Sequence, residues 1–308
     1  MIKLLFKLFI LLIITPSAIS QNQKVWIDAD SGNEVDDIYA IIRLIEESDI
    51  SVAGLSSAHF NNPDLLVFDK WNQYPTENIS TIDISQQINQ DMVSSLKRDD
   101  IICCKGADRQ IGRAWGGFEP RDSEAVKQLT DYIKSMPEGE MLDIICLGAA
   151  TNIASAIILH PEIKQKIRCY MLAAQYDQEK GIWNKNEFNV RNDLNAFDFL
   201  MSEKDVNLYV MPITTCQSFK FKKEDTFNRL DKSNIKHKML IDRWEETEST
   251  SYERILWDLA LAEAYLCPDF CKLELRNVPQ ENGEHKIYVY TYMDADKMIE
   301  DFWNFIKH

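Results

Sequence analysis

The sequence predicts an α/β protein built on an open, mostly parallel β-sheet flanked by helices. Short apolar runs alternate along the chain with segments whose apolar residues recur at helical spacing, which is the pattern of repeated strand–helix units. The chain has 308 residues, of which 45% are hydrophobic, so it can bury a sizeable core. No repeat, low-complexity stretch or Pro/Gly-rich linker divides it. We therefore expect one large domain rather than two small ones.

The N-terminal segment has the layout of a secretory signal peptide. Lys3 precedes the apolar run 4–14, and Lys7 interrupts it. Pro16 and a pattern of small residues follow as far as Ser20. The alternative is a membrane anchor, but the run is shorter than the roughly 20 apolar residues that a bilayer span needs. We expect residues 1–20 to be cleaved and residues 21–308 to form the mature domain. The protein would then be exported, periplasmic or extracellular, with no stable membrane insertion.

Each expected strand is a short run of apolar and β-branched residues. These runs occupy residues 25–27, 50–55, 101–104, 142–147, 168–173 and 206–211. Helices are expected where apolar residues recur at helical spacing or where an apolar run is long for a strand, over residues 38–45, 152–159 and 256–266. The polar segment 220–252 is expected to be helical or to form a mobile cover near the mouth of a site.

Composition limits the classes of partner. The formal net charge is -15 and the pI is near 4.8. A polyanion repels such a chain, so a nucleic acid is not an expected partner. None of the seven cysteines belongs to a zinc-type Cys-x-x-Cys pair. Export would permit disulfides, and Cys267 with Cys271 is the candidate pair.

Five acids crowd the turn after the first expected strand, and they are the most informative feature of the sequence. They are Asp28, Asp30, Glu34, Asp36 and Asp37. Ligand sites in open α/β sheets lie at the carboxyl ends of strands. Carboxylates this close repel one another, and a hard cation such as Ca²⁺, which prefers oxygen ligands, removes the conflict. Simple capping of a helix N-terminus would explain only Asp36 and Asp37, so the pattern favours a metal site.

Two other motifs also place acids in a turn of this kind. An EF-hand loop that starts at Asp28 would need Gly in place of Asn33 and Glu in place of Tyr39, so this motif fails. Phosphatases of the haloacid dehalogenase type also place Asp-x-Asp after the first strand. No recognisable phosphatase Lys accompanies the acids here, which disfavours this alternative without removing it.

Six short motifs occur in the order in which they are found in the nucleoside hydrolases, and the sequence resembles that inosine-uridine-preferring and purine-specific family. The motifs are 28–37, 52–57, 106–109, 147–154, 187–189 with Asp193, and 257–260. Together they span most of the mature chain. The first motif resembles the family's Asp-x-Asp hallmark, with a turn two residues longer than the common form.

The resemblance implies a Ca²⁺-dependent enzyme that hydrolyses the N-glycosidic bond of a ribonucleoside to free base and ribose. By this resemblance the carboxylates of Asp30, Asp37 and Asp258 and the backbone carbonyl of Thr151 would bind Ca²⁺. Asp30 would also orient and deprotonate the attacking water. The family further implies a homodimer or a homotetramer. The alternative class is a catalytically weak, Ca²⁺-dependent ribose- or ligand-binding protein of the same fold.

The substrate side chains follow from the same resemblance. Asp36, Asn61, Glu187 and Asn189 would contact the ribose, and Asn184 or Asn186 is a further possibility. Trp257 stands where broad-specificity members carry His, which resembles the purine-specific branch, where an indole stacks on the base. The alternative is that Trp257 is simply part of an apolar helix.

Other residues near these motifs are assigned more loosely. Trp115 or Phe118 is a second stacking candidate, although ordinary packing is the favoured interpretation of each. The segment 252–254 is close enough in sequence to Trp257 to reach the base. His59 is expected to be structural rather than a general acid. Ala173-Ala174 replaces the usual Gly-Gly, and this departure is expected to alter the pocket wall.

Overall fold

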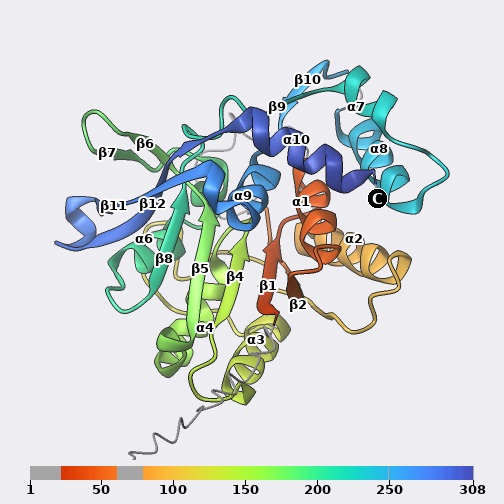
Figure 1. Ribbon diagram of the computed structural model, residues 1–308. Helices are drawn as coiled ribbons and strands as arrows, with labels where there is room; N and C mark the ends of the chain where they lie inside the picture. The colour runs from red at the N-terminus through yellow and green to blue at the C-terminus, as the bar shows by residue number, and fades with distance from the viewer. Residues whose placement is uncertain (1–21, 61–78, 249, 308) are drawn as a thin grey trace, which may run out of the picture.

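The computed structural model of the chain describes residues 22–60, 79–248 and 250–307 (Figure 1). The expected signal peptide, 1–20, and the expected ribose contact Asn61 lie outside these ranges. An eight-stranded sheet runs through the centre in the order β11-β12-β8-β5-β4-β1-β2-β3. Its strands are β1 (Gln23–Ala29), β2 (Ile50–Ser57), β3 (Ile102–Cys104), β4 (Leu142–Cys146), β5 (Ile167–Leu172), β8 (Asn207–Met211), β11 (Cys271–Asn277) and β12 (Lys286–Met293).

The sheet is mostly parallel, which confirms the predicted fold class. Every neighbouring pair runs parallel except β11 and β12. From β1 the chain moves outward through β2 and β3, then returns to the other side of β1 with β4 and continues to β5, β8 and β12. The strand order therefore reverses between β1 and β4. In such sheets the crevice at the carboxyl ends of the two strands is the preferred place for a ligand.

Helices cover both faces of the sheet (Figure 1). They are α1 (Asp36–Ile45), α2 (Thr81–Ser95), α3 (Glu124–Ser135), α4 (Thr151–Leu159), α5 (Phe188–Asn192), α6 (Leu194–Ser202), α7 (Lys223–Arg229), α8 (Ile235–Glu248), α9 (Trp257–Leu266) and α10 (Ala295–Ile306). Successive strand residues point to opposite faces. Val25 and Ile27 accordingly join the apolar cluster under α1, α8, α9 and α10, whereas Trp26 joins the one under α3, α4 and α6.

The segment that was expected to cover the site forms a small unit beside α1. It consists of β9 (Lys220–Lys222), α7, α8 and β10 (Glu253–Ile255), with β9 and β10 paired antiparallel. Helix α8 packs on α1 through Trp244, whose ring meets Tyr39 edge-on with 6.3 Å between centroids. The prediction of helix in this segment is confirmed.

All six expected strands and all three expected helices are present, with ends that differ by a few residues. The expected elements do not include α2, α3, α5, α6, α10 or the β11–β12 hairpin. They also do not include β6 (Gln175–Asp177), β7 (Ile182–Asn184) or the short 3-10 turns at Pro161–Lys166, Pro268–Phe270 and Gln280–Asn282. Among the described residues no helix is long and apolar enough to cross a membrane.

The candidate disulfide between Cys267 and Cys271 is not formed in the structure. All seven cysteines are free thiols, including Cys267 and Cys271. A 3-10 turn separates these two residues, and it turns the Cys267 thiol toward Asp301, with 3.4 Å between Sγ and Oδ2. Cys271 begins β11 and packs against the apolar cluster under α9 and α10. The two thiols therefore belong to different environments.

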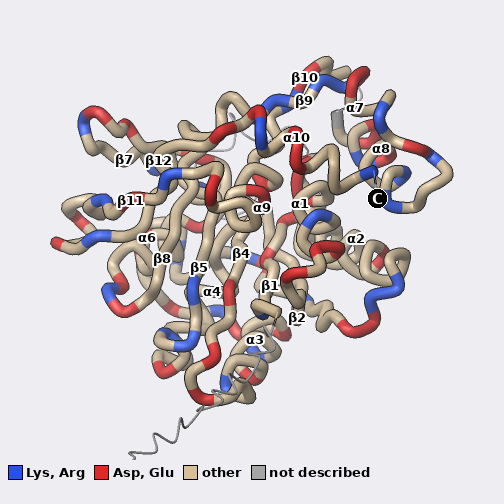
Figure 2. Tube along the Cα trace, in the orientation of Figure 1, with Lys and Arg blue, Asp and Glu red and all other residues tan. Residues whose placement is uncertain are grey.

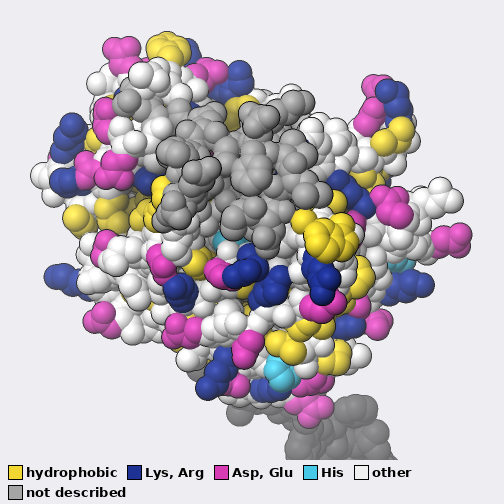
Figure 3. Space-filling model, turned by 180° about the vertical axis from the view of Figure 1, so that it is seen from behind, with side chains coloured by type: hydrophobic (Ala, Val, Ile, Leu, Met, Phe, Trp, Pro, Cys, Tyr) yellow, Lys and Arg dark blue, Asp and Glu magenta, His cyan; other side chains and the backbone are white. Residues whose placement is uncertain are grey.

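Charges of both signs are interspersed over the molecule. Lys and Arg alternate with Asp and Glu around the sheet in Figure 2, and Figure 3 shows the same mixture on the visible part of the opposite face. In these two views acidic and basic residues are therefore intermixed. One group of acids is different, because it is buried at the amino end of α1.

Candidate active site

A pocket of about 300 Å³ opens at the carboxyl ends of the central strands, where the strand order reverses. Its lining falls into three groups. One wall carries the acids Asp30, Glu34, Asp36, Asp37 and Asp258, together with Asn33. A second, polar part of the lining carries Gln175, Asn186, Glu187 and Asn189, and the apolar part consists of Leu172, Phe188, Ile213 and Trp257. The position agrees with the expectation from strand topology.

Two helix N-termini hold three of these acids together. Asp36 and Asp37 lie in the first turn of α1, and Asp258 lies in the first turn of α9. The carboxylates of the three residues come within 4.8 Å of one another, and the backbone N–H of Asp258 donates to Asp36 Oδ2 at 3.1 Å. The positive ends of both helix dipoles favour negative charge here. Residues 221 positions apart in sequence thereby form one site.

Three of the acids have an unsatisfied oxygen. Within the described ranges, Asp30 Oδ2, Asp37 Oδ1 and Asp258 Oδ1 are buried and have no hydrogen-bond partner. Buried polar atoms are normally paired, because an unpaired one forfeits its hydration. These three residues are the ones to which the resemblance assigns the metal carboxylates. The three carboxylates that lie within 4.8 Å of one another belong to Asp36, Asp37 and Asp258. Asp30 is not one of these three, but it lines the same pocket.

Burial makes these carboxylates hard to ionise. It raises the pKa of Asp30, Asp37 and Asp258 well above the usual value, and the charge of neighbouring carboxylates raises each pKa further. For Asp37 the nearby guanidinium of Arg243 acts in the opposite direction. A bound divalent cation would favour the ionised forms and occupy the unsatisfied oxygens, so the donor set fits a hard cation.

Thr151 is held through its side chain and is not among the residues that line the pocket. The hydroxyl donates to Asp193 Oδ2 at 2.6 Å, and His59 Nε2 lies 2.9 Å from the same hydroxyl oxygen. Because the hydroxyl proton points to Asp193, Nε2 of His59 carries a proton and donates it. Burial lowers the pKa of His59 to about 4. The imidazole is therefore neutral near pH 7, and it does not line the pocket.

Glu187 and Asn189 belong to the polar part of the pocket lining. Glu187 caps α5 by accepting from the backbone N–H groups of Asn189 and Val190, each at 3.1 Å. Burial raises the pKa of Glu187 to about 7. The Asn189 amide nitrogen donates to Leu147 O at 2.6 Å, which leaves its oxygen as the group that it can offer to a ligand. Both side chains are buried and fixed in place.

The replacement of Gly-Gly by Ala173-Ala174 has a structural consequence. Ala174 has a φ of +59°, in the left-handed region that costs an L side chain about 1–2 kcal/mol. Its backbone N–H points to Glu187 Oε2 at 3.3 Å, and its carbonyl accepts from Ile213 N at 3.0 Å. Ala174 therefore links Glu187 to the segment after β8 through two backbone hydrogen bonds.

The apolar part of the pocket contains Trp257 and three residues that the sequence analysis did not single out. Trp257 is half-buried, lines the pocket and also packs against the core under α9, so the two interpretations of this residue are compatible. Leu172 ends β5 and Ile213 follows β8. Both residues could have been predicted to line the pocket, because they lie at or just after the carboxyl ends of parallel strands. Phe188 belongs to the motif 187–189, but no contact with a ligand was predicted for it.

Neither Trp115 nor Phe118 is placed to act as a second stacking partner. Trp115 is 76% exposed with its ring beside the Arg113 guanidinium, and Phe118 packs on Phe199. Neither residue lines the pocket, because the loop that carries them leads away toward α6. Of Asn184 and Asn186, only Asn186 is among the residues that line the pocket.

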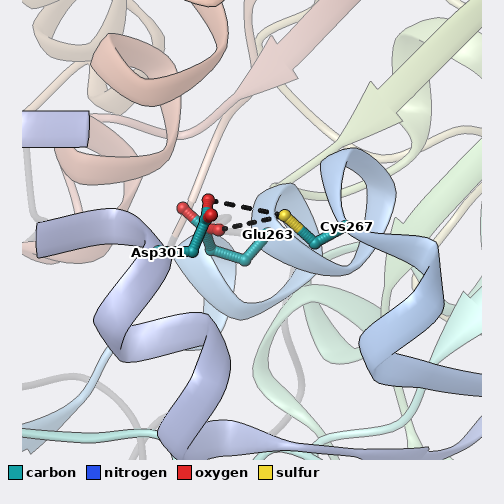
Figure 4. A group of neighbouring side chains, drawn as sticks. All are labelled: Glu263, Cys267 and Asp301. Atoms are coloured by element: carbon teal, nitrogen blue, oxygen red, sulfur yellow. Dashed lines mark hydrogen bonds between the residues drawn. The ribbon is translucent and has the colours of Figure 1, made fainter. Parts of the chain in front are cut away.

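A second group of potential metal ligands lies outside the pocket and has a different explanation. Glu263, Cys267 and Asp301 approach one another between α9 and α10 (Figure 4). The Arg43 guanidinium binds two of them, with Nε 2.8 Å from Glu263 Oε1 and Nη2 3.0 Å from Asp301 Oδ2. Its Nη1 binds Glu47. A buried cation thus already balances this cluster. At the pocket, Arg254 pairs with Glu34 and Arg243 lies near Asp37, but neither residue is among the described lining.

The fold and the site together define an α/β protein with a carboxylate-lined pocket at the switch point of a parallel sheet. Residues 25–300 match the family described as inosine-uridine preferring nucleoside hydrolase, and the chain belongs to this family. It is therefore an N-ribohydrolase, an enzyme that hydrolyses ribonucleosides. A comparison with curated protein sequences finds no match.

Several solved structures share the fold. The inosine-guanosine nucleoside hydrolase IG-NH has a TM-score of 0.69 at 14% identity, with 94% of this chain and 99% of that chain covered. The purine-preferring ribonucleoside hydrolase from Gardnerella vaginalis has a TM-score of 0.63 at 17% identity, with 92% and 98% covered. The inosine-uridine preferring nucleoside hydrolase from Bacillus anthracis has a TM-score of 0.67 at 15% identity, with 92% and 99% covered.

Proposed function

We propose that the protein is a Ca²⁺-dependent ribonucleoside hydrolase that favours purine nucleosides. The observation that carries the proposal is the set of three buried, unsatisfied carboxylate oxygens on Asp30, Asp37 and Asp258. These oxygens, together with the carbonyl of Thr151, would hold the ion. Oxygen ligands of this kind suit Ca²⁺ better than softer metals.

The residues around the ion would divide the reaction between them. When bound, Ca²⁺ would fix the ribose hydroxyls and make the attacking water more acidic. Asp30 would accept a proton from this water, whose oxygen bonds to the anomeric carbon as the N-glycosidic bond breaks. The bonding electrons leave with the base, which then takes up a proton. The surrounding carboxylates would stabilise the positive charge that develops on the ribosyl group.

Carboxylate and amide groups from two parts of the lining would orient the sugar. Asp36, Glu187 and Asn189 line the pocket with oxygens held by backbone hydrogen bonds or helix N-termini. Asn61 belongs to the same proposal but lies outside the described residues. Fixed polar groups of this kind reduce the entropy that a substrate loses in reaching a reactive geometry. The sugar would thus be held between the acid wall and α5.

The apolar part of the pocket favours a neutral, flat base. The indole of Trp257 would stack on a purine, with Leu172, Phe188 and Ile213 completing the apolar surface. No Lys or Arg is among the described lining residues, and the acids there would repel a phosphate. The pocket therefore supports a nucleoside in preference to a nucleotide, which also disfavours the phosphatase alternative.

Hydrolysis of a nucleoside panel would test the proposal. Inosine, adenosine, guanosine, uridine and cytidine would be incubated with the mature protein in Ca²⁺ or in chelator, with Asp30→Ala and the exposed-site control Asp131→Asn in parallel. We expect ribose release that requires both Ca²⁺ and Asp30 and is fastest with purines. Calcium binding with no ribose from any nucleoside would overturn the hydrolase and leave the binding-protein alternative.

Export and assembly are also part of the proposal. Residues 1–20 would direct the chain across the cytoplasmic membrane, and the mature protein would form a homodimer or a homotetramer. N-terminal sequencing of the exported protein should begin at Gln21, and light scattering should give two or four times the mass of the mature chain. A chain retained with Met1 intact, or a monomer at micromolar concentration, would contradict these two points respectively.

A further inference from the structure

The turn that joins β1 to α1 is held on one side by α2. Ser31 Oγ donates to Asn89 Oδ1 at 2.6 Å, and Gly32 N donates to Ser85 Oγ at 3.3 Å. Gly32 packs so closely that a Cβ atom at this position would lie 2.8 Å from the Ile84 side chain. The turn therefore has no room to shift toward α2.

On the other side, Arg243 from α8 fastens both ends of the same turn. Its Nη2 donates to Ser31 O at 2.8 Å, and its Nε donates to Glu34 O at 2.9 Å. The residue is only 9% exposed and reaches the turn from 209 positions away in sequence. A planar guanidinium with donors in fixed directions can hold two carbonyl groups at once, whereas a Lys ammonium lacks this geometry.

Helix α8 is itself fixed against α1. Trp244, the neighbour of Arg243, is fully buried and packs edge-on against Tyr39. The Tyr39 hydroxyl donates to Leu240 O at 3.4 Å. Since α1 also carries the carboxylates of Asp36 and Asp37, one helix contact positions both the guanidinium and the acids. The turn, α1 and α8 thus form one packed unit.

We propose that Arg243 is a positioning residue of the cation site. By holding the carbonyls of Ser31 and Glu34, it fixes the spacing between Asp30 on one side of the turn and the Asp36–Asp37 pair on the other. The inference rests on the proposed function, because it takes these carboxylates as the residues that bind Ca²⁺. A turn two residues longer than the common form can adopt more backbone conformations. The two hydrogen bonds from Arg243, here called the clamp, restrict these conformations.

Geometry and charge predict opposite effects for this residue. As a cation near a cation site, Arg243 would by charge alone weaken Ca²⁺ binding. As a clamp it strengthens binding, because groups that orient metal ligands typically change metal affinity about 10- to 100-fold. The sign of the change on removing Arg243 therefore separates the two roles.

Calcium titration of the mature protein would test the proposal with Arg243→Met and Arg243→Lys. The control is Lys238→Met, an exposed cation on the same helix that pairs with Asp242. We expect both Arg243 variants to raise the Ca²⁺ Kd by about 10-fold or more, with the control within about 2-fold of wild type. Tighter binding by Arg243→Met with unchanged binding by Arg243→Lys would overturn the clamp, as would unchanged binding by both.

Hydrogen exchange of the calcium-free protein provides a readout that does not depend on the metal. We expect the amides of residues 31–37 to exchange faster in both Arg243 variants, while those of α9 and the central strands keep wild-type rates. Unchanged exchange in the turn would overturn the proposal even if Ca²⁺ affinity fell. A wild-type protein that binds Ca²⁺ but hydrolyses nothing would overturn the proposed function and leave this inference standing.

Discussion

The side chain of Trp257 packs against the core under α9 and also lines the pocket. If the indole stacks on the leaving base, its removal should affect purines more than pyrimidines, which offer a smaller π-face. A purely structural Trp257 would affect all substrates alike. The ratio between substrates therefore reports the role of this residue better than any single rate.

We expect Trp257→Ala to lower kcat/KM for inosine and guanosine by roughly 10- to 100-fold, because stacking contributes about 1–3 kcal/mol per base. The decrease for uridine should be smaller, and Trp257→Phe should retain part of the activity. Steady-state kinetics on the two substrate classes would measure this. The control is Trp183→Ala, a half-buried Trp outside this pocket. An equal loss for purines and pyrimidines would contradict stacking.

Ala174 shows how a single residue can store strain beside the site. Its left-handed φ of +59° costs about 1–2 kcal/mol relative to Gly, while Gly loses about 0.5–1 kcal/mol through the entropy of the unfolded chain. We expect Ala174→Gly to raise the free energy of unfolding by about 0.5–1 kcal/mol. Urea unfolding would measure it, with Ala173→Gly as a matched control that should destabilise. A loss in Ala174→Gly equal to that in the control would show that no strain is relieved.

At the scale of secondary-structure elements, Asp193 connects three segments. It caps α6 by accepting from Ala196 N at 2.8 Å, and it accepts from Ile111 N at 2.9 Å and from the Thr151 hydroxyl at 2.6 Å. These bonds hold the start of α4, the loop before α3 and the start of α6 in one arrangement. The residue lies outside the pocket lining, so its contribution is to support the elements that carry the site.

We expect Asp193→Ala to reduce the free energy of unfolding by about 3 kcal/mol, because it leaves three buried donors without a partner. Asp193→Asn should cost less, since an amide oxygen can still cap α6. The control is Asp294→Ala, which removes a single cap from α10 and should cost about 1 kcal/mol. Denaturant unfolding would compare them. Equal losses for Asp193→Ala and Asp294→Ala would contradict the connecting role.

At the scale of the whole molecule, the buried acids link stability to pH and to calcium. The pKa values of Asp30, Asp37 and Asp258 are raised well above the usual range, and that of Glu187 is raised to about 7. A raised folded-state pKa means that the calcium-free protein holds protons that the unfolded chain has lost. These groups therefore reduce its stability as pH rises from about 4 toward 7 or above.

Calcium should offset this loss, because it binds the ionised carboxylates. We expect excess Ca²⁺ to raise the Tm by about 5 °C or more at pH 8, which corresponds to a few kcal/mol at saturation, and by much less at pH 5. Differential scanning calorimetry in Ca²⁺, Mg²⁺ and chelator would measure the shifts. Equal Ca²⁺ shifts at the two pH values would mean that the buried acids are not the ligands.

The sequence by itself determined the elements whose signals are local. β1, β2, β4, β5 and β8 could be predicted because strands buried on both faces are continuous apolar runs. The acids from Asp28 to Asp37 could be recognised because they are neighbours in the chain and crowd a strand–helix turn. Helix α2 was missed because few of its residues are apolar, and the β11–β12 hairpin because its alternation leaves several apolar side chains exposed.

Tertiary structure alone decided the rest of the site. Arg243 meets the acidic turn across 209 positions of sequence, and Leu172 and Ile213 reach the pocket only because β5 and β8 lie beside β4 in the sheet. The absence of the Cys267–Cys271 disulfide and the strain at Ala174 likewise depend on backbone directions. Short-range patterns record burial and charge along the chain, whereas the pairing of distant segments depends on the packing of the whole molecule.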